Sequence, residues 1–325
     1  MGALLPHVKL YGGIKRFLEL GNRFVEMGHS MYVFTPTGEK PDWFNFKGEF
    51  LTLNDLKAKQ LNTLFFTEPD LLQIVLESNA QRKIFYFVRA NESLTKLKRT
   101  GEITFYANST NLVRLAKQKY GVDVFPAIGG VNLAMYSAKP ILPIERGETF
   151  NILAYGRLAE GRKGTMYVVK ACERLIKRGR NVHLILFDTP VTEKMEKAIA
   201  KFSTNIPYDF ILNHPVDRNV EIFHRADVFV APEKKAGWAN TVAEAMACGI
   251  PVIATESGSK DFLISGKTGI VITRNSRKIA NAIELVMDNE SLRREYAENG
   301  RKKIEEFGWD VLANKIIQNL LSVQE

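Results

Sequence analysis

The chain has 325 residues, more than one hydrophobic core usually covers, so we expect two domains. Its net charge of +9 favours anionic partners, but no nucleic-acid-binding motif accompanies that charge, so we expect no nucleic-acid partner. No apolar run approaches the roughly 20 residues of a membrane span, and the N-terminus lacks the pattern of a secretory signal. Cys172 and Cys248, which lack metal-ligand spacing, predict a reducing compartment, the cytoplasm.

Strands and helices alternate along the first half, which predicts a parallel sheet. The first strand, residues 3–5, is short for a central one, as expected if residues before Met1 are missing. Gly12 and Gly13 precede a helix expected at 14–27, where they either let the backbone approach a ligand closely or make a tight turn. Residues 42–59 show no clear period. The remaining strands are expected at 30–35, 65–67, 84–88, 103–107 and 122–127, with helices at 70–78, 93–99 and 110–119.

The pattern restarts after residues 137–148, whose prolines and charges are typical of an interdomain linker. We therefore expect two doubly wound α/β domains, residues 1–142 and 143–308, and a C-terminal helix, 309–325, that could cross back to the first domain. Strands of the second domain are expected at 150–155, 182–187, 208–212, 227–231, 250–254 and 269–273. Its helices are expected at 165–178, 193–202, 219–224, 276–288 and 292–307, besides one that follows residue 240.

The segment 227–254 is a strand, a glycine-bearing loop, a helix capped by Asn240 or Thr241, and a second strand entered after Gly249. This order places unpaired backbone N–H groups at the carboxyl edge of a sheet, which is a site for phosphate. Glu244, in the first turns of the helix, could accept hydrogen bonds from a vicinal diol such as that of ribose. An ordinary βαβ unit with a capping glutamate explains the segment equally well.

The loop 156–164 also follows a strand and precedes a helix, so we expect it at the same edge. Arg157 and Lys163 lie in it between glycines, and a guanidinium and an ammonium can together neutralise a diphosphate. They could also stabilise the charge on a departing diphosphate. The loop has no Walker A order, and basic loop residues are often simply solvated.

Two further features have open interpretations. Trp238 could be a platform for a ligand or could fill the space between its loop and the sheet. Lys96, Lys98 and Arg99, together with the pair at positions 82 and 83, could contact anionic lipid. A solvated face is the interpretation we favour for this basic group.

With these motifs the sequence resembles the family 4 nucleotide-sugar glycosyltransferases of the GT-B fold, over nearly its whole length. The most specific match is the segment 244–253, EAMACGIPVI. The other matching segments are 12–13, 28–33, 107–109, 129–132, 156–158, 163–164 and 226–232.

The resemblance implies two Rossmann-like domains with an interdomain cleft, and a retaining hexosyltransferase of glycan or cell-envelope biosynthesis. It assigns Arg157 and Lys163 to the donor diphosphate and Glu244 to the donor ribose. Metal and cofactor are not required in this family, because basic residues and helix dipoles take their place. The acceptor would be a glycan, a lipid-linked saccharide or a small molecule, reached in the cytoplasm or at the inner face of the membrane. The donor-binding loops would contain Gly12, Gly13, Gly237, Trp238, Ala239, Asn240 and Thr241.

The sequence departs from the family at one position of the donor loop. The family's first glutamate lies eight residues before its second, and Ala236 occupies that position here, while Glu233 is nearby but out of register. The alternatives are a nucleotide-sugar-binding protein without transferase activity, a nucleotide-sugar epimerase and a glycan phosphorylase.

Overall fold

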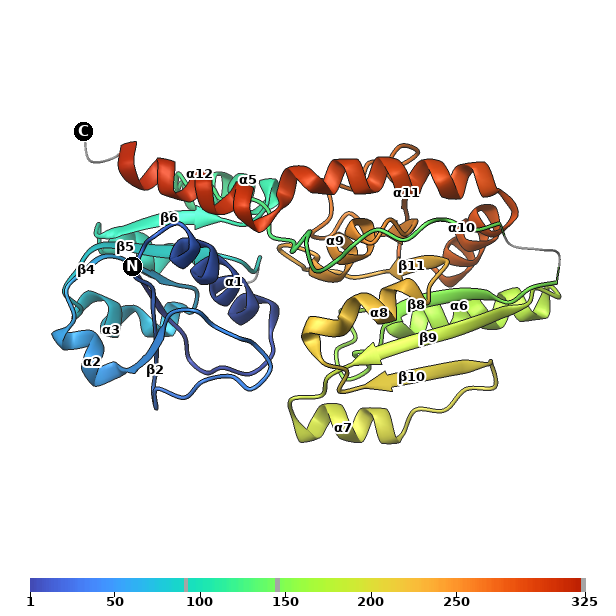
Figure 1. The fold of residues 1–325 in the computed structure, drawn as a ribbon, viewed down its shortest axis with the longest axis horizontal. Helices are drawn as coiled ribbons and strands as arrows, with labels where there is room; N and C mark the ends of the chain where they lie inside the picture. The colour runs from blue at the N-terminus through green and yellow to red at the C-terminus, as the bar shows by residue number, and fades with distance from the viewer. Residues whose placement is uncertain (91–92, 144–146, 323–325) are drawn as a thin grey trace. The chain divides into compact units, whose positions relative to one another are not determined.

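The computed structural model describes residues 1–90, 93–143 and 147–322. The chain forms two compact units (Figure 1), the first made of residues 1–130 and 307–325 and the second of residues 131–306. Each unit has a parallel sheet of its own with helices on both faces, which confirms the expected pair of doubly wound α/β domains.

The first unit contains a seven-stranded sheet in the order β3-β2-β1-β4-β5-β6-β7. Every neighbouring pair is parallel, so each connection must cross a face of the sheet. The short β1 is central, and the chain reverses direction across the sheet between β1 and β4. The strands are β1 (Gly2–Leu4), β2 (Tyr32–Thr35), β3 (Glu49–Thr52), β4 (Leu61–Phe66), β5 (Ala80–Phe87), β6 (Ile103–Ala107) and β7 (Phe125–Pro126).

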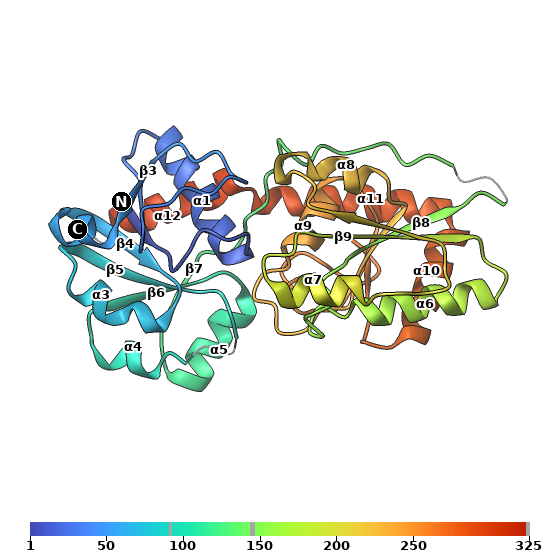
Figure 2. The same ribbon diagram turned by 90° about the horizontal axis from the view of Figure 1, so that it is seen from below.

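Two cores lie on opposite faces of this sheet because successive strand residues point to opposite sides. Phe65 belongs to the core under α1 and α12, whereas Phe66 belongs to the core under α3, α4 and α5 (Figure 2). The C-terminal helix supplies Trp309 and Leu312 to the first of these cores. The helices are α1 (Gly12–Glu26), α2 (Leu53–Ala58), α3 (Leu72–Leu76), α4 (Thr95–Arg99), α5 (Thr110–Tyr120) and α12 (Trp309–Ser322).

The second unit contains a six-stranded parallel sheet in the order β10-β9-β8-β11-β12-β13. Its strands are β8 (Phe150–Tyr155), β9 (Val182–Asp188), β10 (Tyr208–Leu212), β11 (Val228–Ala231), β12 (Val252–Ala254) and β13 (Ile270–Val271). One face buries apolar residues of α6 and α10, among them Val168 and Ile279. The helices are α6 (Thr165–Lys177), α7 (Glu193–Ala200), α8 (Asn219–His224), α9 (Asn240–Ala247), α10 (Ser276–Asp288) and α11 (Glu290–Ile304).

Some elements differ from the expectation. β3 and α2 lie in the segment 42–59 that showed no period, and α2 begins with a capping box in which Thr52 and Asp55 bond each other's backbone N–H. α1 begins at Gly12 rather than residue 14, so the double glycine forms the first helical turn. Part of the expected linker packs on the second unit, where Lys139 Nζ donates to the carbonyls of His224 and Ala226 at 3.0 and 2.5 Å. Residues 144–146 of that linker lie outside the described residues.

Within the described part of the chain, the structure contains no helix that is both long enough and apolar enough to cross a lipid bilayer.

Gly130 makes the packing of the C-terminal helix testable. Its φ is +124°, and a Cβ there would lie 2.3 Å from the Trp309 ring. Gly101 also has positive φ, +72°, but no atom lies within 4 Å of its Cβ position. Gly101→Ala should therefore cost only about 1 kcal/mol for the backbone conformation. Gly130→Ala should lower the thermal unfolding midpoint several degrees further, because Trp309 must leave its place and because a φ of +124° lies outside the left-handed region that alanine can adopt; equal midpoints would contradict this account.

Candidate functional site

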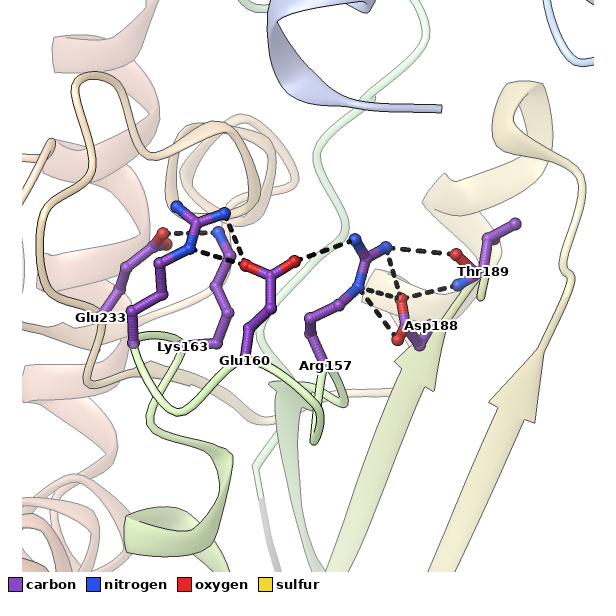
Figure 3. Close-up of polar contacts among 7 residues, drawn as sticks. Arg157, Glu160, Lys163, Asp188, Thr189 and Glu233 are labelled. Atoms are coloured by element: carbon purple, nitrogen blue, oxygen red, sulfur yellow. Dashed lines mark hydrogen bonds and ion pairs between the residues drawn. The ribbon is translucent and has the colours of Figure 1, made fainter. Parts of the chain in front are cut away.

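Three neighbouring strands of the second unit end at one edge of its sheet, in the order β9, β8 and β11. β8 leads into the basic loop 156–164, β9 ends at Asp188, and β11 is followed by Pro232 and Glu233. Because the carboxyl ends of parallel strands lie together, the two basic residues predicted from the sequence share this edge with acidic residues from both flanking strands (Figure 3).

Arg157 is buried at this edge, with 4% of its surface exposed. Its Nε lies 2.9 and 3.1 Å from the two carboxylate oxygens of Asp188, and its Nη2 donates to Oδ1 at 2.8 Å. Nη2 also donates to the carbonyl of Thr189 at 3.1 Å. A guanidinium held along one edge by several bonds to one carboxylate has a fixed plane.

Tyr155, the last residue of β8, contacts both basic side chains. The centre of its ring lies 5.1 Å from the Arg157 guanidinium carbon and 5.4 Å from the Lys163 ammonium nitrogen, within cation–π range. Burial raises the pKa of Tyr155 well above its ordinary value, and the charge of Asp188, with which it hydrogen-bonds, raises it further. Tyr155 is therefore a neutral donor and a platform for two cations, and it is unsuited to act as a base.

Lys163 pairs with Glu233, Nζ to Oε1 at 2.5 Å, and the two side chains are 19% and 7% exposed. The Thr255 hydroxyl donates to the Glu233 carbonyl, and the backbone N–H of Lys234 donates to the carbonyl of Arg162 at 2.9 Å. These bonds tie the loop after β8 to the loop after β11, so the ammonium is held between two segments of backbone.

Glu160 completes the cluster from within the basic loop. Its Oε2 accepts from Arg162 Nε at 2.6 Å, and its Oε1 lies 3.6 Å from Arg157 Nη1. Each basic residue of the loop thus faces a carboxylate, an arrangement that sequence reasoning missed. The signal for Asp188 was available, since an acidic residue ending the neighbouring parallel strand must lie beside this loop.

The helix α9 begins at Asn240, and its N-cap is Ala239, without a side-chain cap. The expected capping by Asn240 or Thr241 is wrong, because both lie inside the first turn. Their backbone N–H groups, as the first in the helix, have no carbonyl of the helix to bond. Thr241 lines a small cavity together with Tyr155, Lys163 and Glu233, which brings this helix start beside the ion pair. The expected C-terminal glycine is confirmed, since Gly249 has a φ of +66°.

The rest of the donor loop is packed against the segment after β12. Trp238 is 7% exposed, and its ring lies 4.7 Å from that of Phe262. This packing is the space-filling role that was one of the two expected for Trp238, and the ring does not form an open platform for a ligand. The backbone N–H of Ala239 donates to the carbonyl of Gly258 at 2.9 Å. Ala236 donates its N–H to Ser257 Oγ at 2.9 Å, so the position of the missing glutamate is held close to that segment.

Glu244 is buried, with 7% of its surface exposed, and is hydrogen-bonded to the Tyr136 side chain. Burial raises the pKa of Tyr136 well above its ordinary value, and the charge of Glu244 raises it further. A phenol that stays protonated donates to the carboxylate, so Glu244 has an orienting partner that the sequence did not indicate.

The remaining predicted residues lie in the first unit. Gly13 has no atom within 4 Å of its Cβ position, so this first turn of α1 presents open backbone. In the basic face, Lys98 donates to the carbonyls of Tyr120 and Gly121 at 3.1 and 3.2 Å. Lys83 lies 3.6 Å from Glu102, and Arg82 donates to the carbonyl of Leu320. Three of these five basic residues thus have partners within the unit.

The described residues contain no group of three or more histidine, cysteine, aspartate or glutamate side chains placed to hold a metal ion.

Comparison with known proteins places this site in a family. Residues 143–303 match the model for glycosyl transferases group 1. The CapM glycosyltransferase of capsular polysaccharide biosynthesis from Staphylococcus aureus is 30% identical over 161 residues, 49% of this chain and 42% of that protein. A phosphatidyl-myo-inositol mannosyltransferase from Mycobacterium leprae is 25% identical over 63% of this chain and 55% of its own length. The chain spans about half the length of these two relatives.

Solved structures match over the whole chain at low identity. HepE from Anabaena, in complex with UDP and glucose, has a TM-score of 0.78 at 14% identity and covers 99% of both chains. Sucrose-phosphate synthase from Thermosynechococcus elongatus has a TM-score of 0.76 at 16% identity, over 99% of this chain and 98% of that one. Residues 143–303 are therefore those of a group 1 glycosyl transferase domain, and the two Rossmann-like units have the GT-B fold.

Proposed function

We propose that this protein is a retaining glycosyltransferase that moves a sugar from a nucleoside-diphosphate sugar to a glycan, a lipid-linked saccharide or a small molecule. One observation carries the proposal. Arg157, Lys163 and the start of α9 lie at the carboxyl edge of the second sheet, inside the segment that matches the family. Such an edge, with cations and free helical N–H groups, suits a diphosphate.

In this proposal each group of the site has its own role. Arg157 and Lys163 bind the diphosphate and stabilise the charge that develops on it as the sugar leaves. The N–H groups of Asn240 and Thr241 face the phosphate, whereas that of Ala239 is already bonded to Gly258. Glu244 accepts hydrogen bonds from the ribose hydroxyls. In the first unit, the glycines at positions 12 and 13 line the path of the transferred sugar, and the reaction requires no metal or cofactor.

The relatives suggest where to look for substrates. HepE was solved with UDP-glucose, and CapM is named for capsular polysaccharide biosynthesis. We therefore propose a role in glycan or cell-envelope synthesis. A thermal-shift panel of UDP-, GDP-, ADP- and dTDP-sugars would identify the donor, because a bound ligand raises the unfolding midpoint. Transfer to an acceptor panel, the anomeric configuration of the product, and activity after treatment with EDTA then test the reaction, its retention and its metal independence.

Arg157→Ala and Lys163→Ala should each lower the rate of transfer about a hundredfold, the scale of losing one electrostatic stabiliser. The measurement is the initial rate at saturating donor. Lys197→Ala, which removes an exposed cation paired with Glu193 in α7, is the matched control and should keep the wild-type rate. Wild-type rates in both site variants would refute the assignment.

Glu244→Ala should weaken binding of the free nucleoside diphosphate, measured by calorimetry, by about tenfold, the scale of one hydrogen bond to a charged group. Tyr136→Phe keeps the carboxylate but removes its hydroxyl partner, so it should weaken binding less. Unchanged affinity in Glu244→Ala would argue against the ribose role.

A nucleotide-sugar-binding protein without transferase activity is the second candidate, because Ala236 stands where the family carries its first glutamate. Tight donor binding without hydrolysis or transfer across the acceptor panel would favour it. An epimerase would convert the sugar of the donor incubated alone, and a glycan phosphorylase would accept inorganic phosphate.

We also propose that the protein works in the cytoplasm, which its two free buried cysteines support, and that it touches an anionic membrane peripherally. Lys96 and Arg99 in α4 would make the membrane contact. Co-sedimentation with anionic vesicles should then fall when both are changed to glutamine, while neutral vesicles should bind neither protein. Equal co-sedimentation of both proteins would remove the membrane from the proposal.

A further inference from the structure

We propose that Asp188 and Glu233 are positioning residues that hold Arg157 and Lys163 at a fixed spacing for the donor diphosphate. The site then selects its ligand by hydrogen-bond geometry rather than by net positive charge. This inference rests on the proposed function and adds to it two residues and a mode of recognition.

Asp188 fixes the orientation of the Arg157 guanidinium. Nε and Nη2 of Arg157 are both bonded to Asp188, and Nη2 is bonded also to the Thr189 carbonyl. The backbone N–H of Thr189 bonds Asp188 Oδ1 in turn, at 2.8 Å, so the carboxylate is itself held. Of the five N–H donors of the guanidinium, those on Nη1 are the ones a ligand would use: Nη1 faces Glu160 Oε1 at 3.6 Å, an ion pair longer than a hydrogen bond. Asp188 thereby chooses which edge of Arg157 a phosphate meets.

Glu233 fixes the position of the Lys163 ammonium. A lysine side chain has four flexible carbons and loses much entropy when it is ordered. Here the short contact with Glu233 and the bond from Thr255 to the Glu233 carbonyl order it before any ligand arrives. The ammonium has three N–H donors, so two remain for phosphate oxygens.

The sheet sets the spacing between the two cations. Asp188 ends β9 and Glu233 follows β11, on either side of β8, and neighbouring strands lie roughly 5 Å apart. Tyr155 at the end of β8 lies between them and contacts both cations. The positions of the three strand ends therefore set the positions of the two carboxylates, and the carboxylates set the distance between the two cations that bind the donor.

The charges of the cluster cancel. Arg157, Arg162 and Lys163 face Glu160, Asp188 and Glu233, three cations against three carboxylates. The net charge of +9 on the whole chain thus lies outside this cluster. A neutral cluster whose inner pairs are buried binds an anion through short directed bonds, which salt screens much less than it screens attraction between exposed charges.

The test uses Asp188→Asn and Glu233→Gln, which keep the shape of each side chain and remove its charge. Asp188→Asn should lower kcat about a hundredfold, the scale of misplacing one electrostatic stabiliser. Asparagine offers one acceptor oxygen where aspartate offers two, so the Arg157 guanidinium should lose its fixed orientation. Glu233→Gln keeps one acceptor for Lys163, so its loss should be smaller. KM for the donor should rise in both variants, because both cations also bind the diphosphate. Glu193→Gln, which breaks an exposed pair with Lys197, is the matched control.

Two further readouts separate positioning from general stability. If Asp188 acts through Arg157, the double variant Arg157→Lys with Asp188→Asn should be little worse than Arg157→Lys alone. Calorimetry with UDP, or the free diphosphate of whichever donor the panel identifies, should show affinity that changes less than threefold between about 50 and about 300 mM salt. If Asp188→Asn fails to fold, Glu233→Gln and the salt series still decide the question.

Several outcomes would overturn the inference. Either carboxylate variant with wild-type kcat, or with tighter binding of the diphosphate, would show that the carboxylate is idle or competes for the cation. Fully additive losses in the double variant would show that Asp188 does not act through Arg157, and a steep salt dependence would show that net charge drives binding. These results leave transfer by the wild-type protein intact, whereas a wild-type protein that neither binds nor transfers any nucleotide sugar refutes the proposed function itself.

Discussion

The buried pair of Arg157 and Asp188 is the interaction on which the second unit's site depends. A guanidinium with 4% exposure needs a carboxylate close by, because an unpaired charge cannot be buried at that depth without a large cost. The pair joins the loop after β8 to the end of β9, and the pair of Lys163 and Glu233 joins the same loop to the segment after β11. The basic loop is thus held from both sides before it meets a ligand.

The two sheets make this arrangement possible. Buried apolar residues on both faces of each sheet hold parallel strands in register, and the parallel order brings polar residues from distant parts of the chain to one edge. The same logic explains α9, whose buried small residues let it lie close to the sheet with its first N–H groups beside Lys163. Asp188 and the start of α9 lie on regular elements, whereas the other polar groups lie in the loops that directly follow β8 and β11.

Ala236, which replaces the family's first glutamate, lies where its loop packs closely against the segment after β12. The segment from Ala236 to Ala239 bonds to Ser257 and Gly258, and a Cβ added at Gly258 would lie 2.8 Å from the Cβ of Ala236. A larger residue at either position would need the two segments to separate. The acidic group of this loop is Glu233 instead, and it is committed to Lys163. The loop therefore combines the family's helix start with a charge arrangement of its own.

The sequence alone predicted the two doubly wound domains, because apolar runs such as 150–155 and periodic segments such as 276–288 report burial directly. It missed β3 and α2, since an edge strand without a fully buried residue and a six-residue helix carry too little pattern. The order of strand, loop and helix also predicted that Arg157, Lys163 and Thr241 lie at one edge of the second sheet. Only the tertiary structure decided their partners: Asp188 lies 31 residues from Arg157 and Glu233 lies 70 from Lys163, and strand order, not local sequence, makes them neighbours.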